Sequence, residues 1–209
     1  MSDVSAYLLR QWNENLPGAD PALWADLWKR YSEKGRHYHN PDHLAAMFRL
    51  FDRYRGCLLD PGAVAVAIFF HDAVYKVTRK DNEEKSATLA AKKLSETGWP
   101  EDSIQLVRMH ILATKRHEPV ADAHPDTAYL LDFDLAILGT PWEEYGLYAH
   151  RIRREYGIYP DLLYRPGRRK ALEHFLERPF IYQTAPFRQT LERPARQNIA
   201  REIAGLVEE

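Results

Sequence analysis

Cysteine is almost absent from this sequence. Cys57 is the single cysteine among 209 residues, so no disulfide can form within the chain. This usage is consistent with a reducing compartment. It also argues against a closed structural zinc site, because such sites are built mainly from cysteine thiolates.

Long apolar runs and an excess of one charge are missing as well. The longest apolar run, residues 63–70, is far too short to span a bilayer, and the first residues lack the basic and apolar pattern of a secretory signal. The net charge of −1 provides no overall attraction to nucleic acid or to membrane surfaces. We therefore expect a cytoplasmic protein with no membrane partner and no specific nucleic-acid binding.

Helical spacing dominates what remains, and no alternating pattern typical of strands stands out. Leu23, Leu27 and Tyr31, for example, recur on one face of a helix. The predicted fold is all-α, a single-domain helical bundle over residues 1–209. Its core is expected at about residues 21–140, with C-terminal helices in 141–209 packed on it.

Several residues mark where helices should begin and end. Asn40 followed by Pro41 predicts an N-cap and a proline at the first helical position. Asp81 with Glu84 three residues later resembles a capping box. Residues 160–167 and 178–186 are expected to be loops.

His71 and Asp72 form the most informative pair, because they follow directly on the apolar run 63–70. Polar groups at the end of a buried segment are costly unless a hydrogen-bond network or a metal ion compensates them. Asp134 is a candidate partner from later in the chain. On a helix it would share a face with large apolar residues, whereas Asp132 would have milder neighbours, so we expect Asp134 on the core side.

Further histidines could complete a metal site. His43 lies on the first turn of its predicted helix, while His39, before Asn40 and Pro41, is a weaker candidate. His110 and His117 fall on one face if a single helix carries both. Mixed imidazole and carboxylate ligands suit Mn²⁺, Fe²⁺, Co²⁺ or Zn²⁺, and Mg²⁺ is compatible.

The order His43, His71-Asp72, Asp134 resembles the H…HD…D signature of the HD-domain superfamily of metal-dependent phosphohydrolases. Six segments are similar to a bacterial subgroup of predicted phosphohydrolases in that superfamily: YHNPDH at 38–43, FHDAVY at 70–75, DNEEKSA at 81–87, DFDLAILG at 132–139, YRPGR at 164–168 and RPFIY at 178–182. The resemblance covers about residues 21–202.

The resemblance implies an HD-type helical fold that holds one or two divalent ions per chain. The implied metal ligands are His43, His71, Asp72 and Asp134, with His110 in the region where some relatives supply histidines for a second ion. Relatives often place a catalytic acid after the doublet. Glu83 and Glu84 are both candidates, of which we take Glu84 forward, and stabilisation of a helix start is the alternative role for both.

The leading hypothesis is hydrolysis of a phosphomonoester or phosphodiester, with nucleotides among the candidate substrates. Asp72 would orient or deprotonate a metal-activated water, and Lys76 and Arg168 are candidate ligands for the substrate phosphate. A di-iron oxygenase of the same fold and a non-catalytic module that binds metal or nucleotide are the alternatives. A small phosphorylated substrate is the expected partner, and a homodimer is compatible with the sequence.

Overall fold

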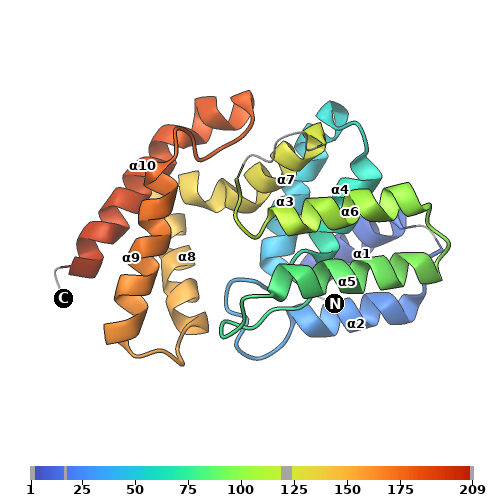
Figure 1. Ribbon diagram of the computed structural model, residues 1–209, viewed down its shortest axis with the longest axis horizontal. Coiled ribbons are helices and arrows are strands. Elements are labelled where there is room, and N and C mark those ends of the chain that lie inside the picture. The colour runs from blue at the N-terminus through green and yellow to red at the C-terminus, as the bar shows by residue number, and fades with distance from the viewer. Residues whose placement is uncertain (1–2, 17, 119–123, 208–209) are drawn as a thin grey trace. The chain divides into compact units, whose positions relative to one another are not determined.

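The computed structural model describes residues 3–16, 18–118 and 124–207 (Figure 1). Its regular elements are helices and no strand occurs in these residues, which confirms the all-α prediction. The helices are α1 (Asp3–Asn15), α2 (Pro21–Tyr31), α3 (Pro41–Tyr54), η1 (Arg55–Cys57), α4 (Pro61–Phe70), α5 (Asn82–Glu96), α6 (Glu101–Ala113), α7 (Pro125–Leu135), η2 (Ala136–Gly139), α8 (Trp142–Glu155), α9 (Asp161–Glu177) and α10 (Ala185–Val207).

The chain divides into two compact units, Met1–Phe133 and Asp134–Glu209, with the boundary inside α7. The expected single domain with a core at 21–140 stays a prediction. None of the helices in the described segments is long and apolar enough to cross a membrane.

Helix α4 is the central element of the first unit and contacts α1, α3, α5 and α6 (Figure 1). All eight residues of its apolar run, 63–70, are buried. A helix that is apolar on every side has to be enclosed by its neighbours. Burial of each large side chain in this run, such as Ile68 or Phe69, contributes about 1.5–3 kcal/mol. This burial fixes the position of the C-terminal end of α4, which lies directly before His71.

Helix α1 was not expected from the sequence, yet it covers one side of α4. Its Leu8 and Trp12 are buried at an i, i+4 spacing. The ring of Trp12 packs edge-on against Phe69 of α4, with ring centroids 5.1 Å apart. Trp24 of α2 contacts both Trp12 and Phe69, so the same aromatic cluster joins three helices.

The two predicted helix starts have different outcomes. The Asn40 side chain accepts hydrogen bonds from the backbone N–H groups of Asp42 and His43, and Pro41 is the first helical residue, as predicted. Asp81 precedes α5 but makes no side-chain capping bond, so the expected capping box is wrong. Its carboxylate instead pairs with Arg79 at 2.9 Å and Lys85 at 3.4 Å.

The second unit contains η2, α8, α9 and α10. The prediction of a loop at 160–167 is wrong, because α9 begins at Asp161 and includes Pro166. The backbone N–H groups of Leu163 and Tyr164 already bond to Pro160 O, at 2.9 and 3.0 Å. Helix α9 therefore continues through Pro166, although proline disfavours a helix interior.

We expect Gly139→Ala to destabilise the second unit. A Cβ at Gly139 would lie 2.6 Å from Leu191 Cβ and 2.9 Å from Leu191 O, closer than packed atoms tolerate. Overpacking of this kind costs about 1–3 kcal/mol. Gly146→Ala is the matched control, since nothing lies within 4 Å of its Cβ position in α8 and alanine favours helix. Urea unfolding followed by circular dichroism measures both, and equal stability of the Gly139 variant and the wild type would contradict the packing described.

Candidate metal centre

His43 is held in the first turn of α3 by the local sequence. Pro41 suits the first helical position, and Asn40 Oδ1 accepts from His43 N at 3.4 Å. The imidazole is only 5 % exposed. The buried His43 imidazole therefore projects from a capped helix start, in the first helical turn that the sequence predicted.

His71 and Asp72 follow α4 directly. The N–H of His71 still donates to Ala67 O at 2.8 Å, so the helical backbone carries the imidazole into position. His71 Nδ1 lies 2.9 Å from Ile68 O. A carbonyl oxygen can only accept, so Nδ1 carries a proton and, in the neutral ring, Nε2 presents its lone pair. A bond of this kind to the second ring nitrogen is what orients metal-binding histidines.

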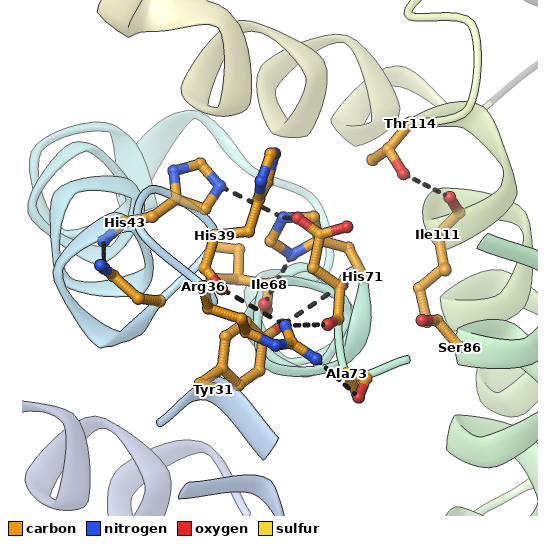
Figure 2. A network of polar contacts seen from close by, with 12 residues as sticks. Tyr31, Arg36, His39, His43, Ile68, His71, Ala73, Ser86, Ile111 and Thr114 are labelled. Carbon is orange, nitrogen blue, oxygen red and sulfur yellow. Dashed lines mark hydrogen bonds and ion pairs between the residues drawn. The ribbon is translucent and has the colours of Figure 1, made fainter. Parts of the chain in front are cut away.

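Three possible ligand atoms meet at this point. His71 Nε2 is 3.3 Å from His43 Nε2 and 3.1 Å from Asp72 Oδ2. Figure 2 shows the rings of His43 and His71 beside one another at the centre of the network. Within residues 3–16, 18–118 and 124–207, these three residues form the one group of at least three His, Cys, Asp or Glu side chains close enough to hold a metal ion.

The arrangement calls for a positive charge. With the proton of His71 on Nδ1, the lone pair of Nε2 faces the lone pairs of the Asp72 carboxylate, which repel it unless a cation intervenes. A second proton on His71 or a metal ion meets this need. Metal–ligand bonds of about 2.0–2.2 Å leave neighbouring ligand atoms roughly 3–3.5 Å apart. The donor types and their separations therefore fit a divalent metal, and the group could hold one.

The two aspartates of α7 differ from the sequence-based expectation. Asp132 is 0 % exposed, whereas Asp134 is half-buried, so the prediction that Asp134 occupies the more buried position is wrong. The prediction assumed that the α-helix continues to residue 138. The backbone instead tightens into η2 after Leu135, so Ile137 and Leu138 no longer extend the α-helical face of Asp134. Asp134 belongs to the second unit, and its role as a ligand stays a prediction.

His110 is fully buried but lies outside the three-residue group. Its Nδ1 is 2.9 Å from Thr127 Oγ1, and its Nε2 is buried without a hydrogen-bond partner. Burial lowers its pKa to about 4. His117 does not share its helix face, because α6 ends at Ala113 and His117 adopts a positive φ of 51°. His39 stacks on Tyr75, with ring centroids 4.3 Å apart.

The two candidate acids after the doublet have different surroundings. Glu84 forms an ion pair with Lys115, which lowers the pKa of its carboxyl group. Burial raises the pKa of Glu83 above its usual range, and the charge of Asp72 raises it further. The charge of Asp72 therefore acts on Glu83, whereas Lys115 is the largest influence on Glu84. The structure thus favours Glu83 over Glu84, which we selected from the sequence.

The two residues predicted to bind the substrate phosphate, Lys76 and Arg168, also have different surroundings. Lys76 is exposed in the segment after the doublet, where its backbone N–H and C=O both bond to the Asn82 side chain. Arg168 pairs with Glu202 in the second unit, with Nε and Nη2 at 2.7 and 3.0 Å from the carboxylate oxygens. This buried ion pair favours a structural role for Arg168 over the predicted contact with a substrate.

Two residues that contact the backbone at the doublet were not predicted from the sequence. Arg36 donates to the backbone carbonyls of Asp72 and Ala73, and the Tyr31 hydroxyl accepts from the Asp72 N–H. These partners lie 36 to 41 positions apart in the chain. Local periodicity carries no signal for contacts over that separation. A clue was the need to satisfy the carbonyl groups where a buried helix ends.

Comparison with protein-family models, curated proteins and solved structures gives no match for this chain. The resemblance to the HD-domain superfamily accordingly stays a prediction.

We expect His110 to make the protein less stable in acid. Below its unfolded pKa of 6.5 the unfolded chain takes up a proton that the folded chain refuses until about pH 4. The contribution of neutral His110 to the free energy of unfolding therefore decreases by about 2–3 kcal/mol as the pH falls from 6.5 to 4. Urea unfolding in chelator at several pH values should show the stability difference between wild type and His110→Gln changing by this amount.

The matched control is His150→Gln, which removes an exposed imidazole. A difference between wild type and His110→Gln that is independent of pH would contradict the buried, neutral state of His110.

Proposed function

We propose that this protein is a metal-dependent phosphohydrolase. In this proposal His43, His71 and Asp72 hold a divalent ion, and Asp134 is a predicted fourth ligand. The observation that carries the proposal is that ligand atoms of His43, His71 and Asp72 lie within 4.8 Å of one another, with both histidines buried and Asp72 partly exposed. The motif resemblance supplies the reaction class.

Each residue has a distinct part in the proposed reaction. A divalent ion bound here would lower the pKa of a bound water and polarise a phosphoryl oxygen. His71 is kept in its metal-binding orientation by Ile68 O. Asp72, whose side chain is 13 % exposed, is the member of the group that solvent reaches most readily and is placed to orient a water. Glu83, with its raised pKa, is placed to exchange a proton with the reacting groups.

The ligand set supports one ion more directly than two. The alternative of a di-iron oxygenase needs additional ligands, and His110 is engaged with Thr127 outside the group. Two imidazoles favour Mn²⁺, Fe²⁺, Co²⁺ or Zn²⁺ over Mg²⁺. We propose phosphomonoesters or phosphodiesters as substrates, with nucleotides as the first class to test.

Metal removal and loss of Asp72 should both abolish turnover. We expect the full-length chain to hydrolyse members of a nucleotide and phosphoester panel with Mn²⁺, and to lose activity in chelator. Asp72→Ala should lower kcat/KM by about 10²–10⁴-fold, the range for loss of a group that handles the proton. Asp81→Ala is the matched control, because Asp81 is exposed and pairs with Arg79 outside the metal-binding group. Equal activity of wild type and Asp72→Ala would refute the proposal.

The acids of α5 provide a second test. Glu83→Gln should lower kcat more than Glu84→Gln, because the charge of Asp72 acts on Glu83 whereas Glu84 pairs with Lys115. Loss of an acid–base group predicts a decrease of about 10²-fold or more for Glu83→Gln. Steady-state kinetics of both variants with saturating Mn²⁺ measures this. A larger loss in Glu84→Gln would restore the choice made from the sequence.

A further inference from the structure

The end of α4 is where the metal-binding group is built, and helix ends are structurally weak. The last carbonyl groups of a helix have no partner within it. His71 and Asp72 stand at this end, so any change in the backbone there moves two of the three proposed ligands together. Contacts that hold the backbone directly after this helix end therefore also set the position of the ligands.

Arg36 holds the backbone of the segment that follows α4 directly. Its Nη1 donates to Asp72 O at 2.7 Å and to His39 O at 3.3 Å, and its Nη2 donates to Ala73 O at 3.3 Å. The side chain is only 4 % exposed. Its positive charge also complements the negative end of the α4 dipole. Arg36 thus joins the segment before His43 to the segment that carries the doublet.

Two aromatic rings hold the guanidinium in place. Its central carbon lies 5.0 Å from the centroid of Tyr31 and 5.5 Å from that of Tyr75, within the range of cation–π contacts. Figure 2 shows Tyr31 beneath Arg36, with Ala73 beyond the guanidinium. The Tyr31 hydroxyl accepts a hydrogen bond from Asp72 N at 3.2 Å. The backbone N–H and C=O of Asp72 are therefore both held by buried side chains.

We infer that Arg36 and Tyr31 are positioning residues of the metal centre. They contribute no ligand atom, and they act by fixing the backbone of Asp72 so that its carboxylate stays beside His71 Nε2. The inference rests on the proposed function, since it concerns the same metal site. It adds residues to that site which neither the doublet nor the resemblance indicated.

The second unit contains a matched control. Arg196 Nη1 donates to Leu176 O at 3.0 Å, and its Nη2 donates to Arg178 O at 2.7 Å and Pro179 O at 3.1 Å, at the end of α9. This arginine makes the same kind of contact at a helix end that carries no proposed ligand. A purely structural role predicts similar consequences for both arginines, whereas a positioning role predicts an effect on metal binding for Arg36 alone.

The test measures Co²⁺ binding to the metal-free, full-length chain by visible absorption, with folding followed by circular dichroism. The variants are Arg36→Lys, Arg36→Met and Tyr31→Phe, with Arg196→Met as control. We expect Arg36→Met to weaken Co²⁺ binding by about 10- to 100-fold, as for other groups that orient metal ligands. Arg36→Lys keeps the charge but not the planar guanidinium group. We therefore expect its affinity for Co²⁺ to lie between those of the wild type and Arg36→Met. Arg196→Met should lower thermal stability and leave the Co²⁺ affinity unchanged.

A spectroscopic signature separates positioning from folding. At saturating Co²⁺, Arg36→Lys or Tyr31→Phe should show shifted absorption bands while the helix content matches the wild type. If Arg36→Met does not fold, these two milder variants decide the question. Wild-type affinity and spectrum in every folded variant would overturn the inference and leave the metal site standing. Absence of Co²⁺ binding by the wild type would overturn the proposed metal site and the inference with it.

Discussion

The structure depends on one electrostatic requirement, which is a positive charge among His43, His71 and Asp72. The bond from His71 Nδ1 to Ile68 O fixes the proton on that nitrogen, so Nε2 turns its lone pair towards a carboxylate oxygen 3.1 Å away and a second imidazole nitrogen 3.3 Å away. Without a cation the lone pair of His71 Nε2 and the Asp72 carboxylate repel one another. A second proton on His71 or a metal ion would supply the charge, and a metal ion could use all three residues as ligands.

Apolar burial and polar contacts together bring the residues of this group to one place. Burial of α4 on every side decides where His71 and Asp72 emerge. The capped start of α3 brings His43 to the same place. Arg36 then bonds to the carbonyl groups of Asp72 and Ala73, directly after α4. Each buried carbonyl group left unpaired would cost about 1–3 kcal/mol. Stability of the helix end and geometry of the ligands are therefore set by the same contacts.

Much of this could be predicted from local patterns. The apolar run before the doublet and the Asn40-Pro41 start identified His43, His71 and Asp72, which the structure brings together. Features that depend on tertiary contacts could not be predicted in this way. The α-helical face assumed for Asp134 ends with the change to η2. The ion pair of Glu84 with Lys115 joins residues 31 positions apart, so it could not be predicted from local spacing. Arg36 was missed because its partners lie in another segment.

The most direct measurement is a crystal structure of the full-length chain grown with Mn²⁺, with the ion located by anomalous scattering. We expect an anomalous peak at about 2.0–2.3 Å from His43 Nε2, His71 Nε2 and the Asp72 carboxylate. The crystal structure would also show which further ligand completes the coordination shell of the ion. A structure in which His71 bonds directly to Asp72 through a proton, with no ion between the three residues at saturating Mn²⁺, would contradict the central claim.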